Sequence, residues 1–267
     1  MDYDLIRVFN NDDGAQGNQS AVVTLKKKIT GVDELSHIAT NIYKEKSVAT
    51  SCFIINEDNE QFEVRCFNRD SEIQCCGHGL IAAAKVIFSR SKLINIVLNR
   101  NIAAVNKDDE IELSLPRISA KVCETADWAN KAMTYGGECL LPNQTAISEK
   151  LDGYLLFEFN PNLSLDVFSE LLLDLNTVCE STKRAIVIIQ FDEENRHLYT
   201  RYFAPQYGVK EDSATGSVMR FVGDYIMQTY NIAEYQVNQC SKEGGYMKIK
   251  CREKDVLITA NATIESF

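Results

Sequence analysis

One strand–turn–helix device occurs twice in this sequence, and the repeat constrains the fold more than any other feature. The first copy runs from Arg65 to Phe88, and the second runs from Arg201 to Ile226. Each copy has an Arg-x-Phe strand, a polar turn and a loop of small residues that precedes an apolar run. Because the two copies are separated by about half of the 267-residue chain, the repeat predicts two similar domains.

The small-residue loops of the two copies predict a binding site for an anion. Cys76 aligns with Ser213 at an offset of 137 residues, and Gly79 aligns with Gly216. Each loop is expected to begin a helix, whose first turn has unpaired amide N–H groups and a partial positive charge. Two such helix ends that face one cavity would hold a small anionic substrate.

The periodicity of the chain predicts an α+β protein. The run from Leu80 to Ser89 is apolar almost all round, which is typical of a helix buried on every side, here inside a sheet that wraps around it. Short alternating runs predict strands, and residues 163–175 predict a helix. We expect an N-terminal domain over residues 1–117 and a C-terminal domain over residues 118–267, whose last strand can return to the first domain.

Composition excludes several classes of partner. The formal net charge is −10, which argues against nucleic acid or an anionic membrane as a partner. No apolar stretch is long enough to span a membrane, and the N-terminus has no signal-peptide pattern. The nine cysteines are scattered without CxxC pairs, and only three histidines occur, which argues against a metal site and predicts a cytoplasmic protein.

In the first loop, two side chains are candidates for proton transfer. Cys76 stands at the start of the expected helix, where a thiol is shifted toward the reactive thiolate. The alternative is an ordinary buried cysteine. His78 lies between two glycines and titrates near neutral pH, so it suits a proton shuttle or a hydrogen-bond donor. Its alternative is a capping or packed histidine.

The second loop offers a carboxylate and several donors. Asp212 directly precedes Ser213, where it is either a general base or a helix N-cap. Backbone N–H groups and hydroxyls of Thr215, Gly216 and Ser217 are candidate ligands for a substrate carboxylate. The Gly17-Asn18 pair in an earlier loop could reach the same site, although both residue types are common in turns.

Three segments of the chain, in order, resemble the PhzF-like family of phenazine biosynthesis, within the diaminopimelate epimerase-like fold. They are Val8-Phe9 with Gly17-Asn-Gln-Ser-Ala-Val-Val, then Glu72-Ile-Gln-Cys-Cys-Gly-His78, and Arg201-Tyr-Phe-Ala-Pro with Glu211-Asp-Ser-Ala-Thr-Gly-Ser217. The resemblance implies two pseudo-symmetric domains, each a curved, mostly antiparallel sheet around a central helix. It also implies a homodimer.

The resemblance further implies a cofactor-independent isomerase or epimerase that moves a proton on a small carboxylate in the interdomain cleft. By position, His78, Asp212 and Ser217 match polar active-site positions of PhzF-like isomerases, and Cys76 matches the first catalytic cysteine of the epimerase branch. We take Cys76, His78 and Asp212 as candidate catalytic residues. The candidate substrate-binding residues are Asn18, Thr50, Gly77, Gly79, Ser213, Thr215, Gly216 and Ser217.

The chain departs from the family pattern at three positions. Thr50 stands where the proton-shifting Glu of PhzF isomerases is expected, and Gln19 stands where the family has proline. Ser213 aligns with the second cysteine of the epimerases. These departures favour a directional isomerase over a symmetric two-thiol racemase. A one-cysteine amino-acid racemase or dehydratase, or a binding protein of the same fold without catalysis, are the alternatives.

Overall fold

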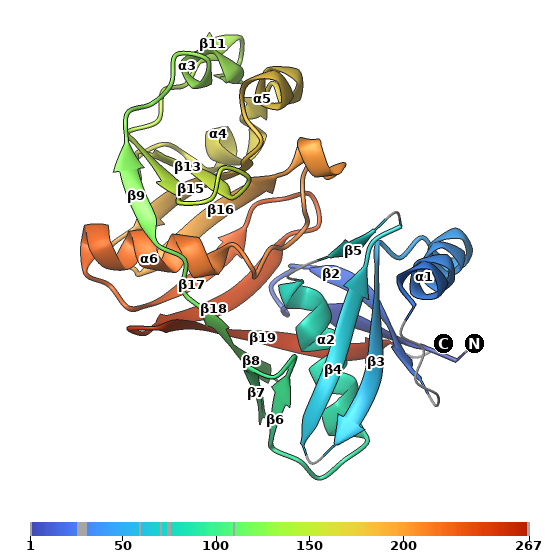
Figure 1. The fold of residues 1–267 in the computed structure, drawn as a ribbon. Coiled ribbons are helices and arrows are strands. Elements are labelled where there is room, and N and C mark those ends of the chain that lie inside the picture. The colour runs from blue at the N-terminus through green and yellow to red at the C-terminus, as the bar shows by residue number, and fades with distance from the viewer. Residues whose placement is uncertain are drawn as a thin grey trace. The chain divides into compact units, whose positions relative to one another are not determined.

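The computed structural model describes residues 2–25, 31–58, 60–69, 71–73, 76–108 and 110–265, without the side chains of residues 56–58. The chain forms two compact units (Figure 1). Unit 1 comprises Met1–Leu115 and Leu257–Phe267, and unit 2 comprises Pro116–Val256. The C-terminal segment therefore belongs to the same unit as the N-terminal segment.

Unit 1 is a ring of strands. The strands are β1 (Asp4–Val8), β2 (Asn18–Thr24), β3 (Thr50–Asp58), β4 (Gln61–Phe67), β5 (Glu72–Ile73), β6 (Asn95–Leu98), β7 (Ile102–Lys107), β8 (Glu110–Pro116) and β19 (Asp255–Glu265). Their order is β1-β2-β3-β4-β6-β7-β8-β19, and β19 also pairs with β1, which closes the ring. The short strand β5 pairs with β4.

Helix α2 (Gly77–Ser89) lies inside this ring of strands (Figure 1). It contacts β1, β2, β3, β4 and β7, and its side chains from Leu80 to Phe88 are buried except for Lys85. An apolar helix of this kind has no face suited to water, so it is stable only when neighbours surround it. The predicted buried helix is therefore confirmed.

Helix α1 (Val32–Lys46) packs against the outside of β3 and β4. Leu35, Ala39 and Ile42 recur at helical spacing on its buried face. They join a cluster that includes Phe53 and Phe67, whose rings meet edge to face at 5.6 Å. Unit 1 thus has one apolar layer around α2 and a second one under α1.

Unit 2 has a seven-stranded sheet and a small second sheet. The strands are β9 (Ala120–Cys123), β10 (Met133–Tyr135), β11 (Glu138–Cys139), β12 (Gln144–Ser148), β13 (Tyr154–Phe159), β14 (Leu172–Leu173), β15 (Ala185–Asp192), β16 (His197–Phe203), β17 (Glu234–Gln239) and β18 (Gly245–Cys251). The order of the large sheet is β18-β17-β16-β15-β13-β12-β9, and β11-β10-β14 forms the small one.

The helices of unit 2 are α3 (Ala129–Ala132), α4 (Leu165–Glu170), α5 (Leu175–Ser181), the 3₁₀ helix η1 (Pro205–Tyr207) and α6 (Met219–Tyr230). Helix α6 contacts β18 and β9 through an almost continuous buried run from Met219 to Ile226. It is therefore the counterpart in unit 2 of the central helix of unit 1.

The two units repeat one strand topology. The series β1-β2-β3-β4-β6-β7 pairs in the order antiparallel, parallel, antiparallel, parallel, antiparallel. The series β12-β13-β15-β16-β17-β18 pairs in the same order. In both, the connection between the fourth and fifth strands contains the central helix, because parallel neighbours need a crossover. The predicted α+β fold of two similar, mostly antiparallel units is confirmed.

Two expectations about helices are wrong in detail. The helix expected over residues 163–175 is two helices, because the chain becomes extended at Leu171 and Asp174 then caps α5 through the amides of Asn176 and Thr177. The helix of the second copy begins at Met219, whereas its loop predicts a start directly after Gly216.

Among the described residues, no helix has the length and apolar character needed to cross a membrane.

Candidate active site

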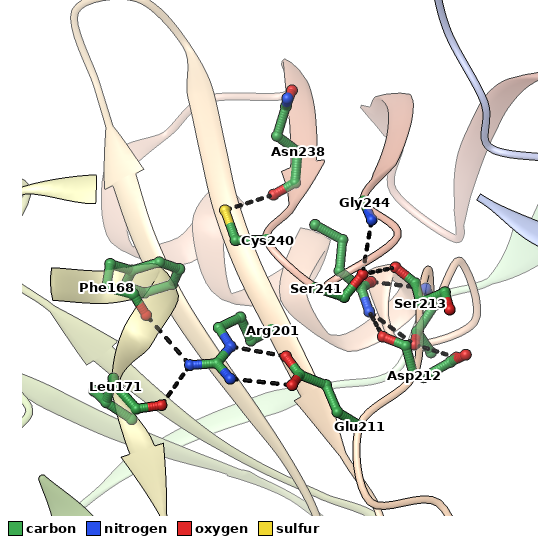
Figure 2. Close-up of polar contacts among 12 residues, drawn as sticks. Phe168, Leu171, Arg201, Glu211, Asp212, Ser213, Asn238, Cys240, Ser241 and Gly244 are labelled. Carbon is green, nitrogen blue, oxygen red and sulfur yellow. Dashed lines mark hydrogen bonds and ion pairs between the residues drawn. The ribbon is translucent and has the colours of Figure 1, made fainter. Parts of the chain in front are cut away.

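Both copies of the repeated device fix their loop with an arginine–glutamate pair. In unit 1, Arg65 on β4 donates from Nε and Nη2 to Glu72 at 2.6 and 2.5 Å. In unit 2, Arg201 on β16 donates from the same atoms to Glu211 at 2.8 and 3.1 Å (Figure 2). Two parallel charge-assisted hydrogen bonds hold a carboxylate in one orientation. Each glutamate therefore ties the start of its loop to the preceding strand.

The same guanidinium groups explain the Phe of each Arg-x-Phe motif. Arg65 lies over the ring of Phe67 at 5.4 Å, and Arg201 lies over Phe203 at 4.9 Å. The hydrogen bond from Arg65 also holds the pKa of Glu72 below its ordinary value. The sequence pattern did not predict the roles of Glu72 and Glu211. The available signal was a glutamate shortly before the small-residue loop in both copies.

The first loop leads directly into α2, as expected. Cys76 is the N-cap residue, and the helix starts at Gly77. Leu80 donates its amide to the carbonyl of Cys76 at 3.0 Å, which closes the first turn. Within the described part of the chain, the amides of Gly77 and Gly79 form no intramolecular hydrogen bond. Both residues are buried, and their amides belong to the first turn of α2, where N–H groups have no partner within the helix. Gln74 and Cys75 lie outside the described residues.

The Cys76 side chain lies in a cluster of three thiols. It is 5% exposed and forms a hydrogen bond with Cys66, whose Sγ is 3.4 Å from that of Cys52. The hydrogen bond with Cys66 and the burial together raise the pKa of Cys76 well above its ordinary value. The expected thiolate is therefore wrong: the packed thiols outweigh the helix N-terminus, and Cys76 stays protonated at neutral pH.

His78 and Thr50 lie side by side in unit 1. The imidazole Nε2 is 3.0 Å from Thr50 Oγ1, at the start of β3, and 3.6 Å from the sulfur of Cys76. Thr50 is buried, and His78 is half-buried. Three of the predicted site residues therefore meet around the first turn of α2. Thr50, which replaces the expected glutamate, orients the imidazole instead of supplying a carboxylate.

Gly17 and Asn18 have clear structural roles at the start of β2. Gly17 has φ 64°, and a Cβ there would lie 1.9 Å from the carbonyl oxygen of Val8. Asn18 is half-buried, and Ser20, two residues further on, pairs with Thr50. The parallel pairing of β2 with β3 thus brings Asn18 to the end of the sheet at which β3 begins.

The second loop is closed by internal hydrogen bonds. The Thr215 hydroxyl donates to Asp212 Oδ2 at 2.5 Å, and the Thr215 amide donates to Gln239 Oε1 at 2.7 Å. The amide and the hydroxyl of Thr215 are thus both paired inside the protein, and its role in binding a substrate anion stays a prediction. No intramolecular hydrogen bond is formed by the amides of Gly216 and Ser217 in the described ranges. Gly216 is buried and Ser217 is half-buried, and both precede α6.

Ser213 is held by the segment between β17 and β18. Its hydroxyl donates to Glu243 at 3.1 Å. Its carbonyl accepts from the Ser241 hydroxyl at 2.7 Å (Figure 2). Sequence reasoning missed Gln239, Ser241 and Glu243. No motif marks them, because they reach the loop only through the parallel pairing of β16 with β17.

Unit 1 also contains a cavity of about 510 Å³ along the edge of β4. A gap in the wall exists because β4 pairs with β6 only at Gln61 and Phe62, after which the Asn99 side chain bonds both backbone groups of Val64. The cavity walls include Arg65, Cys66, Glu72, Cys76, Leu80 and Arg100. Its volume suits a small metabolite, and it approaches the Cys76 thiol from the side of β4.

The remaining titratable groups do not assemble a metal centre in the described ranges, where no three His, Cys, Asp or Glu side chains are placed to hold a metal ion. The two loops instead supply amides without an intramolecular partner, an imidazole in unit 1 and a carboxylate in unit 2. Open amides stabilise negative charge, and the two side chains suit proton transfer.

Known proteins resemble this chain over most of its length. The sequence profile of the phenazine biosynthesis-like (PhzC-PhzF) proteins matches residues 6–266. An uncharacterized isomerase of Vibrio cholerae is 28% identical over 83% of this chain and 76% of its own. A crystal structure of a PhzF-family protein from Enterococcus faecalis has a TM-score of 0.82 at 19% identity and covers 99% of this chain and 96% of its own. A probable proline racemase from Agrobacterium radiobacter has a TM-score of 0.62 at 8% identity, covering 99% and 92%.

Proposed function

Because this chain belongs to the PhzC-PhzF family of phenazine biosynthesis-like proteins, we propose that it is an isomerase that moves a proton on a small carboxylate-bearing metabolite. The isomerase class is supported by the relatives from Vibrio cholerae and Halalkalibacterium halodurans that are named isomerases. The substrate class and the placing of the reaction in a cleft between the two units are part of the proposal.

The duplicated loop carries this proposal. Among the described residues, the amides of Gly77 and Gly79 in one unit, and those of Gly216 and Ser217 in the other, have no intramolecular partner. Fixed N–H donors bind a carboxylate and also stabilise the enolate-like charge that develops when the adjacent carbon loses its proton. A carboxylate substrate therefore suits both loops.

Asp212 and His78 are the proposed acid–base residues. The Asp212 side chain is oriented by the Thr215 hydroxyl, and its own amide donates to Tyr202 O at 3.0 Å. His78 is oriented by Thr50. A carboxylate at neutral pH accepts a proton, and an imidazole both accepts and donates one. Cys76 is a poorer base because burial and Cys66 keep its thiol protonated.

This assignment gives directional chemistry. A racemase with two equivalent thiols needs a reactive sulfur on each face of the substrate, whereas this chain has a protonated thiol in one loop and the Ser213 hydroxyl in the other. The proposed path abstracts the proton with Asp212 and returns one to another carbon of the same conjugated acid through His78. No electrons leave the substrate in such a shift.

Solvent exchange tests the proposal. The protein is incubated in deuterated water with a panel of small unsaturated, hydroxy and amino carboxylic acids, and deuterium uptake on carbon is followed by proton NMR. We expect uptake into at least one acid. Asp212→Asn should slow it by about 100-fold or more, because a positioned base contributes at least that much.

Asp192→Asn is the matched control, because it makes the same change at the end of β15, where the carboxylate accepts hydrogen bonds from Asn195 and from the Glu194 amide. This control should retain full exchange. Undiminished exchange in Asp212→Asn would remove Asp212 from the mechanism. Tight binding of an acid without any exchange would instead indicate a binding protein, the function that Thr50 in place of a glutamate favours.

A further inference from the structure

We propose that Gln239 is a positioning residue that holds the Asp212 loop in its active geometry. The inference rests on the proposed function and adds a residue to it. Gln239 ends β17 and is 2% exposed. It lies outside both copies of the repeated device and bonds neither the Gly216 amide nor the Ser217 amide. Its action on the reaction is therefore through the loop.

The Gln239 side chain bridges both ends of the loop. Its Nε2 donates to the carbonyl of Asp212 at 2.6 Å, and its Oε1 accepts from the amide of Thr215 at 2.7 Å. Each end of the amide group therefore satisfies one backbone group. Only a side chain that donates and accepts at once can do this, which is a property of the amide group.

The bridge reaches the Asp212 carboxylate through one more hydrogen bond. With its amide held by Gln239, Thr215 presents its hydroxyl to Asp212 Oδ2 at 2.5 Å. Without Gln239 the Thr215 N–H would be buried and unpaired, a condition that a loop relieves by moving. Such a movement would turn the hydroxyl away from the carboxylate and displace the proton acceptor.

The segment that follows Gln239 supports the loop as well. Ser241 donates to the carbonyl of Ser213 and accepts from the Gly244 amide at 3.0 Å (Figure 2). At Gly245 a Cβ would lie 2.4 Å from that of Ala214, so the two backbones pack directly. Gln239 is the one member of this support that reaches the Thr215 amide, which makes it the sharpest point to test.

Two variants at this position separate its two hydrogen bonds. Gln239→Glu keeps the acceptor for the Thr215 amide but lacks the donor for Asp212. Gln239→Met has a similar length and lacks both. Gln190→Met is the matched control, because Gln190 is equally buried in the same unit and donates to the carbonyls of Asn160 and Leu163, in a loop that contains no site residue.

Three measurements are made on each variant: kcat and KM for deuterium uptake, hydrogen exchange of the peptide that contains Thr215, and the thermal midpoint. We expect Gln239→Met to lower kcat by roughly 10- to 100-fold with little change in KM, because a small displacement of a catalytic group acts on the chemical step. Gln239→Glu should fall between it and the wild type. Exchange at Thr215 should be faster in both.

Gln190→Met should lower the thermal midpoint about as much as Gln239→Met and leave kcat unchanged. Equal loss of kcat in the two methionine variants would show a general loss of stability and overturn the proposal. Unchanged kcat, or unchanged exchange at Thr215, in Gln239→Met would also overturn it. If the wild type turns over no acid, the proposed function fails, and Thr215 exchange alone decides whether Gln239 holds the loop.

Discussion

The two copies of the repeated device share their anchor and differ in what lies behind the loop. Arg65 with Glu72 and Arg201 with Glu211 form the same two-point ion pair, each beside the Phe of its motif. Behind the first loop lie three thiols in close contact. Behind the second lies a set of directed hydrogen bonds centred on Gln239.

This difference shows that backbone geometry and side-chain support vary independently. Thiol packing depends on volume, because an atom added to a close-packed cluster forces side chains or backbone to shift. A hydrogen-bonded support depends on donors and acceptors, because a buried polar group without a partner is costly. The first copy should therefore be sensitive to size and the second to polarity.

The largest effect is expected at Gly79. A Cβ on Gly79 would lie between 2.6 and 2.9 Å from the sulfurs of Cys52, Cys66 and Cys76, so Gly79→Ala should destabilise the protein by about 3 kcal/mol or more. Gly223→Ala on α6 is the control: its nearest contact would be a methyl of Val256 at 3.2 Å, and alanine is the better helix former. Urea unfolding of both variants measures the difference. Equal stability of the two would show that the thiols yield easily.

The second prediction compares the two anchors. Arg201→Met should cost about 3 kcal/mol, because the arginine side chain is only 9% exposed and also donates to the carbonyl of Leu171 at 2.6 Å. Arg65→Met should cost about 1 to 2 kcal/mol, since Arg65 is 17% exposed. Unfolding free energies of the two variants provide the test. A larger loss from Arg65→Met would reverse the ranking of the anchors.

The third prediction concerns pH and the first anchor. Arg65 depresses the pKa of Glu72 below its ordinary value of 4.5, so the ion pair stabilises the folded state above that pH. The contribution is lost as the pH falls below 4.5 through the pKa of the folded state. Between pH 7 and pH 3 the wild type should therefore lose more stability than Glu72→Gln, by under about 1 kcal/mol because the pair is partly exposed. Parallel pH profiles of the two proteins would contradict this.

The smallest expected effect concerns the reactivity of the Cys76 thiol, and it leaves the stability of the protein unchanged. Because the hydrogen bond with Cys66 and burial raise the pKa of Cys76, iodoacetamide at pH 8 should modify the exposed Cys139 and Cys179 first. Cys76 should react at least about tenfold more slowly. The aligned position in the second copy is half-buried, so the thiol in Ser213→Cys should react faster than Cys76. Mass spectrometry of digested samples follows each site. Rapid labelling of Cys76 would restore it as a candidate for proton transfer.

Much of the fold followed from local pattern. The run from Leu80 to Ser89 is apolar on all sides, so burial of α2 needed no knowledge of its neighbours. The start of α6 could not be placed in the same way, because Met219 donates to the carbonyl of Gly216 and delays the helix. A single helix was predicted over residues 163–175 because the stretch has helical periodicity. The buried Leu171 interrupts it and divides it into α4 and α5.

By itself, the sequence determined that a loop, a central helix and an arginine strand occur twice, because these features depend on residues close together in the chain. Only the tertiary structure decided the state of the groups in those loops. The protonation of Cys76 depends on Cys66, and the closure of the second loop depends on Gln239. Both partners come from other strands, and hydrogen bonding and desolvation act over a few ångströms of space regardless of distance along the chain.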